Sequence, residues 1–165
     1  MIPAVVLAAG AASRYGSPKQ RLLLPAVLER LARAPVEHVV VVEGAHALGD
    51  LVAPPAEVVR CPEWRRGPGA SLRCGLAALG DDAEGALVVL ADGPNLDPRA
   101  VERVLAHRFD GDVLAAEYDG TRGHPVWLAR AVWTWIPDEG MRAVPARLVA
   151  CDDLDPPGDV DRPDS

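Results

Sequence analysis

Small residues and two cationic side chains are concentrated in one stretch near the start of the sequence, LAAGAASRYGSPK (7–19). The turn Ala8–Gly10 has no large side chain, so its backbone N–H groups can come close to an anion. Arg14 and Lys19 follow in the same stretch and add positive charge. This combination favours the binding of a triphosphate over the alternative of a solvated basic turn.

Spacing excludes the two most familiar phosphate-binding motifs from this stretch. The dinucleotide motif GxGxxG needs a glycine two residues after the first, and Ala12 stands at that place after Gly10. The P-loop motif GxxxxGK(S/T) needs a lysine directly after its second glycine, whereas Lys19 lies three residues beyond Gly16. A phosphate site here would therefore be of another kind.

Short apolar runs rich in Val and Leu alternate along the chain with segments of helical spacing. The runs are continuous, which is typical of strands covered on both faces, as in a parallel sheet. We expect strands at 4–9, 38–43, 56–61, 86–91 and 112–117, and helices at 25–34, 69–80 and 97–108. The last helix has the strongest start signal, an Asp97 N-cap followed by Pro98. The sequence therefore predicts an α/β domain, a three-layer α/β/α sandwich around a mostly parallel, Rossmann-like sheet. In such a sheet the loop after the first strand is a common phosphate site, and residues 7–19 occupy that loop.

The length and charge of the chain narrow the function classes. With 165 residues we expect a single domain, 1–165, without an internal repeat or a linker. The formal net charge of −7 argues against nucleic acid or an anionic membrane as a partner, because either needs a basic face. No apolar run approaches the roughly 18 residues that span a bilayer, and the chain opens without a basic leader. We therefore expect a cytoplasmic protein.

The cysteines and tryptophans suggest packing more than chemistry. Cys61, Cys74 and Cys151 are odd in number, scattered and without a CxxC pair, so neither a disulfide framework nor a zinc site is indicated. We expect them to be small buried hydrophobic residues. The tryptophans are expected to pack in the core instead of stacking on a ligand; they are Trp64, Trp127, Trp133 and Trp135.

The first stretch resembles LAAGxSxRxGxxK, the signature of the nucleotidyltransferase family related to molybdenum cofactor cytidylyltransferase and guanylyltransferase. Further segments resemble motifs of the same family in the same order. They are PEWRRGPGASLRCGLAAL (62–79), similar to its nucleotide-side turn and helix; LVVLADGPNLDP (87–98), similar to its metal-binding D-x-P strand end; YDGTRGHPVWL (118–128), with its acceptor-side GHP motif; DEGMRAV (138–144), similar to its D-x-G-x-R helix; and GDVDRPDS (158–165), similar to its acidic terminus. The resemblance implies a nucleotidyltransferase of GT-A-like fold. It also implies that the acidic tail, 151–165, contributes to the site, although its composition alone would allow disorder.

The resemblance implies a Mg²⁺-dependent reaction that moves an NMP from an NTP to a phosphorylated small-molecule acceptor such as molybdopterin and releases pyrophosphate. CTP is favoured as the donor, because family members with LAAG tend to use CTP and those with LAGG tend to use GTP. In-line transfer of this kind depends on positioning and charge neutralisation and needs no protein nucleophile. A molybdenum enzyme is a possible partner by the same resemblance.

Catalytic and metal-binding roles follow from the matched motifs. Arg14 and Lys19 would bind the triphosphate and stabilise charge on the leaving pyrophosphate. Asp92 would hold Mg²⁺, which prefers one or two carboxylates beside substrate phosphates. The second metal ligand would come from the tail, Asp161 first and Asp159 as the alternative.

The nucleotide and the acceptor would contact different segments. The expected nucleotide-binding residues are Leu7, Ala8, Ala9, Gly10, Arg14, Lys19, Gly69 and Ser71. Ser71 would use its hydroxyl or an N–H at the start of a helix, and as a plain N-cap it would need no ligand. The acceptor side would comprise Gly123, His124 and Pro125, and the alternative for His124 is a purely structural histidine.

The chain departs from the family pattern at several places. Lys19 is followed directly by QRLLLPAVLERLA, without the usual glycine-containing turn, Gly93 replaces the usual Gln, and Arg162 replaces the usual Thr. These changes fit a different acceptor or a loss of activity. They leave open a non-catalytic nucleotide-binding partner in cofactor insertion and, less favoured because GxGxxG is missing, an oxidoreductase on the same scaffold.

Overall fold

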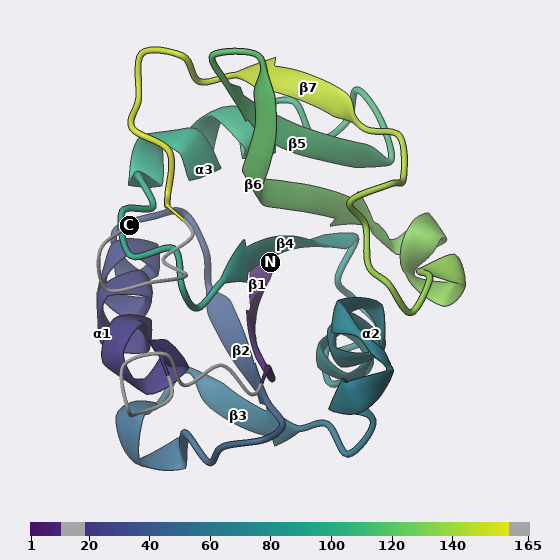
Figure 1. Cartoon of the computed structure of the whole chain (residues 1–165). Coiled ribbons are helices and arrows are strands. Elements are labelled where there is room, and N and C mark those ends of the chain that lie inside the picture. The colour runs from purple at the N-terminus through teal and green to yellow at the C-terminus, as the bar shows by residue number, and fades with distance from the viewer. Residues whose placement is uncertain (11–18, 159–165) are drawn as a thin grey trace.

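A computed structural model describes residues 1–10 and 19–158 of the chain (Figure 1). The described strands form a seven-stranded sheet in the order β3-β2-β1-β4-β6-β5-β7. The strands are β1 (Pro3–Ala8), β2 (His38–Glu43), β3 (Glu57–Arg60), β4 (Gly85–Leu90), β5 (Val113–Tyr118), β6 (Thr121–Ala129) and β7 (Arg147–Ala150). The α-helices are α1 (Lys19–Ala32), α2 (Pro68–Ala77) and α3 (Pro98–Ala106), and 3-10 turns span Gly49–Leu51, Trp64–Arg66 and Arg130–Trp135.

The helices cover both faces of the sheet, so the expected three-layer α/β/α sandwich is confirmed (Figure 1). Alternate residues of β1 enter two separate cores because successive side chains of a strand point to opposite faces. Ala4 and Val6 pack in the core formed with α1 and α3, whereas Val5 packs in the core formed with α2. Burial on both faces explains why the strand sequences are continuously apolar.

The sheet is mostly parallel, with one reversed strand that the sequence did not reveal. β1, β2, β3 and β4 pair in parallel, and β6 runs antiparallel between β4 and β5. The strand at 121–129 is not among those predicted from the sequence, and glycine and proline inside this run weaken its pattern. The edge strand β7 was also missed, since its four residues are too short to show a pattern. The GHP motif therefore lies on β6, within the sheet.

Helix α1 begins at Lys19, six residues before the predicted start at Pro25, which lies inside the helix. Leu24, Val27 and Leu31 lie on one face and are fully buried or nearly so. This burial holds the helix together across the proline, which lacks an N–H donor. The consequence is that Lys19 occupies the first position of a helix and not a loop.

The helix starts of α2 and α3 differ. In α3, Asp97 is the N-cap as expected: its Oδ1 accepts a hydrogen bond from the Arg99 N–H at 2.9 Å. In α2 the N-cap is Gly67, and Ser71 lies in the first turn with its N–H donating to the Gly67 carbonyl at 3.3 Å. The interpretation of Ser71 as an N-cap is therefore wrong.

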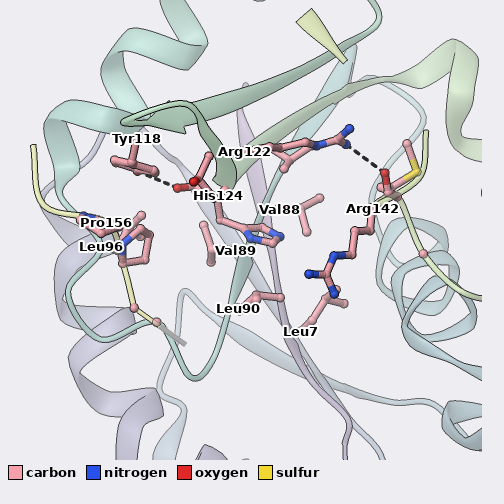
Figure 2. Close-up of a pocket in the computed structure, with 18 of the residues that line it drawn as sticks. Leu7, Val88, Val89, Leu90, Leu96, Tyr118, Arg122, His124, Arg142 and Pro156 are labelled. Carbon is pink, nitrogen blue, oxygen red and sulfur yellow. Dashed lines mark hydrogen bonds between the residues drawn. The ribbon is translucent and has the colours of Figure 1, made fainter. Parts of the chain in front are cut away.

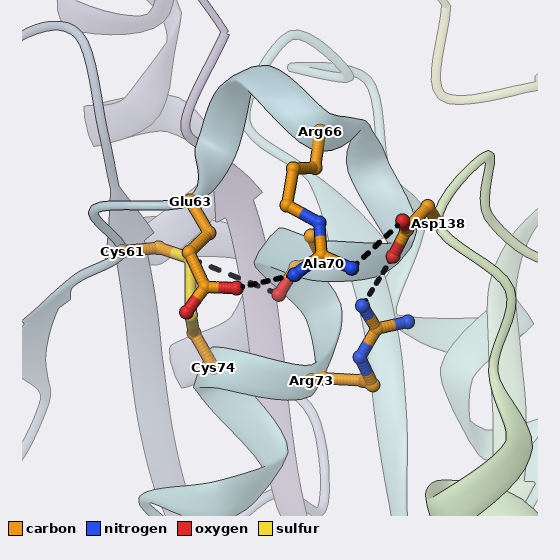
Figure 3. Close-up of a disulfide and its surroundings, with 7 residues drawn as sticks. All are labelled: Cys61, Glu63, Arg66, Ala70, Arg73, Cys74 and Asp138. Carbon is orange, nitrogen blue, oxygen red and sulfur yellow. Dashed lines mark hydrogen bonds and ion pairs between the residues drawn. A yellow bond between two sulfur atoms is a disulfide. The ribbon is translucent and has the colours of Figure 1, made fainter.

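The absence of a disulfide was also a wrong prediction. Cys61, which follows β3, is bonded to Cys74 in α2, with their Cα atoms 5.8 Å apart (Figure 3). The two cysteines are 13 residues apart in sequence and form no motif, and they meet only because α2 packs against the end of β3. Cys151 is free and buried, as expected.

Three of the four tryptophans fit the packing prediction and one does not. Trp127 and Trp133 are buried, and Trp64 packs against Gly44, where a Cβ would come within 2.5 Å of its ring. Trp135 is 51% exposed at the end of its 3-10 turn and is therefore not a core residue.

The described part of the acidic tail, 151–158, is attached to the domain. Arg103 of α3 forms an ion pair with Asp153, and the Asn95 N–H donates to the Pro157 carbonyl at 3.0 Å. Within the described residues, no helix is both long and apolar enough to cross a membrane.

Candidate functional site

The ends of β1 and β4 bring the first stretch and Asp92 to one edge of the sheet. Leu7 on β1 lies opposite Leu90 on β4, and the Ala91 N–H donates to the Leu7 carbonyl at 3.0 Å. Because the strands are parallel, the residues that follow them leave the sheet at the same edge. The turn Ala8–Gly10 and Asp92 therefore lie on one side of the molecule.

Lys19 and Asp92 form an ion pair at this edge. The Lys19 Nζ lies 3.0 Å from Asp92 Oδ2, and their side chains are 7% and 16% exposed. Lys19 is in helix α1, which the structure describes from this residue onward. A buried ammonium at this edge of the sheet is suited to an anion.

Gln20 is a buried polar residue next to this pair that sequence reasoning missed. It is buried next to Lys19, and its Nε2 lies 3.3 Å from the position that a Cβ would take at Gly10. A side chain at position 10 would therefore crowd the amide of Gln20. Nothing in the sequence singles out this glutamine, because its contact depends on how α1 sits against β1.

The start of α2 is held by a segment from far along the chain. The Gly69 N–H donates to the Asp138 carbonyl at 2.8 Å, and a Cβ on Gly69 would overlap the Pro137 carbonyl oxygen. Position 69 therefore needs a glycine for packing alone, whether or not a nucleotide binds there. Since the backbone N–H groups of Gly69 and Ser71 are used within the protein, the buried Ser71 keeps only its hydroxyl for the predicted nucleotide contact.

Two arginines bond the start of α2 to the 136–138 segment (Figure 3). Asp138 accepts hydrogen bonds from Arg73 and Arg66, and Arg73 also donates to the Ile136 carbonyl. The Arg73 hydrogen bond, helped by Arg66, holds the pKa of Asp138 below its usual value. With the disulfide on the other side of α2, the start of this helix is fixed from two directions.

A cavity of about 1090 Å³ lies between the end of β4, the β5–β6 hairpin, the 139–142 segment and the tail (Figure 2). Apolar side chains make up much of its lining, and they are Leu7, Leu72, Val88, Val89, Leu90, Leu96, Val126 and Met141. Two of the predicted acceptor-side residues, Gly123 and His124, line it, and Pro125 is buried in β6 beside them.

His124 is a neutral group in this cavity. Burial lowers its pKa to about 4, although the nearby Asp92 carboxylate acts in the opposite direction. The imidazole is therefore uncharged at neutral pH, and it can donate or accept a hydrogen bond but is a weak base.

Tyr118 sets the backbone around His124. Its hydroxyl donates to the His124 carbonyl at 2.7 Å, and burial raises its pKa, so that the phenol stays protonated. Its ring also lies 3.2 Å from the position of a Cβ at Gly123, which explains why a glycine precedes His124. Tyr118 was not among the predicted site residues.

The tail reaches the loop that carries Asp92. A Cβ on Gly93 would lie 3.0 Å from Pro157 Cβ and 3.3 Å from the Gly158 carbonyl oxygen. This close packing accounts for the glycine where family members usually have Gln. Arg14, Asp159 and Asp161 lie outside the described residues, so their predicted roles stay predictions.

The donor set around Asp92 is compatible with a hard divalent cation. Within the described residues, no three His, Cys, Asp or Glu side chains form a metal-binding group. A single carboxylate at the edge of a cavity is nevertheless a common arrangement for Mg²⁺, which takes its other ligands from water and substrate phosphates.

Comparisons with known proteins agree with this architecture. The model of the MobA-like NTP transferase domain matches residues 4–148. The crystal structure of Rv0371c from Mycobacterium tuberculosis H37Rv is 30% identical, with a TM-score of 0.82, over 99% of this chain and 95% of that one. A manganese complex of the same mycobacterial protein is 27% identical, with a TM-score of 0.79, over 99% of this chain and 94% of that one.

A curated relative is much longer than this chain. Bifunctional protein GlmU from Mycolicibacterium paratuberculosis is 34% identical over 119 residues, which are 62% of this chain and 24% of that protein. The chain thus spans about a quarter of that relative's length. The match to the family model covers most of the chain and includes both strand ends that carry the site. The chain belongs to the MobA-like NTP transferase domain family, and its fold is that of a nucleotidyltransferase.

Proposed function

We propose that this protein is a divalent-metal-dependent nucleotidyltransferase that moves CMP from CTP to a phosphorylated small-molecule acceptor such as molybdopterin. The observation that carries the proposal is the buried Lys19–Asp92 pair at the joined ends of β1 and β4. It places a cation for phosphate and a carboxylate for a metal at the same point. This is the charge arrangement that phosphoryl chemistry needs.

In this proposal the triphosphate lies on the backbone of Ala8–Gly10 with Lys19 beside it. Lys19 stabilises the negative charge that develops on the departing pyrophosphate. Asp92, with Asp161 or Asp159 from the tail, would hold Mg²⁺, which neutralises phosphate charge when bound. The manganese complex of the mycobacterial relative supports a divalent metal, and the choice of Mg²⁺ follows from the resemblance alone.

The tail is long enough for the proposed second ligand. Gly158 lies against Gly93, next to Asp92. Asp161 follows three residues later, and three extended residues span about 10 Å.

The chemistry balances without a protein base. An oxygen of the acceptor phosphate forms a bond to the α-phosphorus, the bond from that phosphorus to the β-bridging oxygen breaks, and pyrophosphate leaves with the electron pair. A phosphate dianion has no proton to lose at this step. The neutral, weakly basic His124 is compatible with such an acceptor, which it would orient by a hydrogen bond.

The test is pyrophosphate release from CTP or GTP with Mg²⁺ or Mn²⁺ and molybdopterin. We expect CTP to be the better donor, and Lys19→Ala to reduce the rate by at least about 100-fold, since it removes a charge that stabilises the transition state. Arg21→Ala is the matched control, because Arg21 is a cation on the same helical turn whose partner is the exposed Asp50. Thermal unfolding of both variants shows whether they fold.

Lys19 is the only lysine in the sequence, which allows a direct binding assay. Pyridoxal phosphate with borohydride should label Lys19, and CTP with Mg²⁺ should protect it, as read by peptide mass spectrometry. If Lys19→Ala releases pyrophosphate at the wild-type rate, Lys19 does not stabilise the departing pyrophosphate. Binding of CTP without release of pyrophosphate across an acceptor panel favours a non-catalytic nucleotide-binding protein.

A further inference from the structure

The Cys61–Cys74 disulfide closes a ring of the chain, residues 61–74, that contains the start of α2 (Figure 3). We propose that this disulfide is redox-active: a dithiol reductant opens it at Cys74, and the oxidised form binds the nucleotide more tightly than the reduced form. The inference deepens the proposed function and rests on it for the nucleotide. The thiol exchange, and the loosening of the ring that follows from it, can be tested without a nucleotide.

The ring includes two of the predicted nucleotide-binding residues. Gly69 and Ser71 lie among residues 62–73, between the two cysteines. A cross-link limits the conformations that the enclosed chain can adopt. A binding segment that is already held in one position loses less conformational entropy when its ligand binds. The closed ring therefore favours nucleotide affinity.

The two ends of the ring are held differently. Cys61 follows β3 directly, its N–H donates to the Glu43 carbonyl at the end of β2 at 2.8 Å, and its side chain is fully buried. Cys74 lies within α2 and is partly exposed. The disulfide thus ties a surface helix to a fixed point at the carboxyl ends of β2 and β3.

The ring also packs beside the turn Ala8–Gly10, the predicted phosphate site. Trp64, inside the ring, contacts Gly44, where a Cβ would lie 2.5 Å from the indole and 2.6 Å from the Ala9 carbonyl oxygen. The Ala45 N–H donates to the same Ala9 carbonyl at 3.3 Å. A shift of Trp64 therefore changes the packing next to this turn, so the state of the ring bears on the phosphate end of the nucleotide as well.

Cys74 carries the sulfur that a reductant can reach, because it is the partly exposed member of the pair. Arg73 precedes it, and residues 62–73 include three arginines and one glutamate in a chain whose net charge is −7. Positive charge favours thiolates, which are the attacking and leaving groups of thiol–disulfide exchange. The surroundings of the disulfide therefore suit this exchange.

The exchange uses the two thiols of one reductant. The first, as a thiolate, forms a bond to the Cys74 sulfur, the disulfide bond breaks, and Cys61 leaves with the electron pair and takes up a proton. The second thiolate attacks the reductant sulfur of this mixed disulfide, and Cys74 leaves and is protonated in turn. The protein gains two electrons and two protons, and the dithiol becomes a disulfide.

The fold can accommodate the reduced cysteines. Cys61 Sγ lies 3.7 Å from the Ala70 carbonyl oxygen, so the thiol formed there has an acceptor in place. Helix α2 keeps its packing on β1, which is so close at Gly75 that a Cβ would lie 2.6 Å from Val5. It also keeps its hydrogen bonds to the 136–138 segment. Reduction should therefore loosen the ring while the domain stays folded.

Equilibration with oxidised and reduced dithiothreitol tests the exchange. The full chain is held at a series of ratios, alkylated and analysed by peptide mass spectrometry. We expect Cys61 and Cys74 to become alkylated together, and amide hydrogen exchange in residues 62–73 to speed up by about fivefold or more, with an unchanged circular dichroism spectrum. Alkylation of either cysteine in the oxidised protein, or loss of the folded spectrum on reduction, overturns the inference.

Calorimetric titration with CTP and Mg²⁺ tests the consequence for binding. We expect the reduced protein to bind CTP about fivefold or more weakly than the oxidised protein, because the ring is no longer preorganised. Coupling between two equilibria is reciprocal, so saturating CTP should make the disulfide harder to reduce by the same factor. A merely structural cross-link would not produce this second effect.

Two variants complete the experiment. Cys74→Ser should bind CTP like the reduced wild type and should not respond to dithiothreitol. Cys151→Ala is the matched control, because Cys151 is a free, buried cysteine in the core on the other face of the sheet, and it should respond like the wild type. Equal CTP affinity in the two redox states overturns the inference, as does a response of Cys74→Ser to dithiothreitol.

The same data separate this inference from the proposed function. If CTP fails to bind while Cys61 and Cys74 exchange reversibly and the ring amides respond, the nucleotidyltransferase proposal fails and the redox-active disulfide stands. If CTP binds and turns over equally in both redox states, only the inference fails.

Discussion

The two halves of the site are built in different ways. The proposed nucleotide side consists of residues at the ends of two adjacent parallel strands, closed by a buried ion pair. The proposed acceptor side is the cavity formed by the end of β4, the start of α2, the β5–β6 hairpin, the 139–142 segment and the tail, and it carries a neutral histidine among apolar walls. Because several separate segments line the cavity, substitutions in one of them can alter the proposed acceptor side while the two strand ends of the proposed triphosphate side stay unchanged.

The largest effect is expected from Asp92→Asn, which breaks the nucleotide side directly. It should reduce pyrophosphate release by at least about 100-fold. It should also destabilise the fold by about 3 kcal/mol, because Lys19 loses its carboxylate partner in a buried place. Rates and urea unfolding measure the two effects. Asp50→Asn, which loses an exposed pair, should leave activity unchanged, and an active Asp92→Asn protein would show that the pair is only structural.

Gly69→Ala tests whether the start of α2 depends on its junction with the 136–140 segment. The new Cβ would overlap the Pro137 carbonyl oxygen, so α2 and that segment must separate, at a cost of about 3 kcal/mol. Because the same segment continues into residues 139–142, which line the cavity, binding on both sides should weaken. Gly49→Ala is the control, since nothing lies within 4 Å of the position its Cβ would take. An unchanged Tm for Gly69→Ala would contradict the close contact.

Cys74→Ser removes the second support of α2 at a point that does not line the cavity. Loss of a cross-link over a separation of 13 residues should cost about 2–3 kcal/mol. Dithiothreitol should lower the wild-type Tm to that of the variant and leave the variant unchanged. Because Ser71 lies in α2, we expect the KM for CTP to rise more than that for the acceptor, so an equal rise in both would remove the distinction between the two sides.

His124→Gln is expected to have the smallest effect, and it is confined to the acceptor side. The loss of one hydrogen bond should raise the KM for the acceptor by about fivefold, with no change in the KM for CTP. A rise in the KM for CTP alone would assign His124 to the nucleotide side.

The same variant has a distinct pH signature in stability. The pKa of His124 is lowered to about 4, so the unfolded chain takes up a proton below pH 6.5 while the folded protein does not. The wild type should therefore lose stability relative to His124→Gln as the pH falls from 6.5 toward 4, with a constant difference above pH 7. Urea unfolding at several pH values measures this, and a difference that does not vary with pH would show that the imidazole is not buried.

Much of the fold could be predicted because its signals are local. The strands at 38–43 and 86–91 follow from continuous apolar runs, and the start of α3 follows from Asp97 and Pro98. The strand β6 could not be predicted in the same way, because Gly123 and Pro125 obscure its pattern and only pairing with β4 and β5 makes it a strand.

The sequence by itself determined the α/β alternation, the small-residue stretch after the first strand and an aspartate at the end of β4. The tertiary structure alone decided that Lys19 meets Asp92, that Cys61 meets Cys74, that Gly69 carries a carbonyl contact and that Arg142 faces the cavity. The physical reason is range. Periodicity and capping depend on neighbours within a few residues, whereas these contacts depend on how strand ends, helices and loops distant in sequence pack against one another.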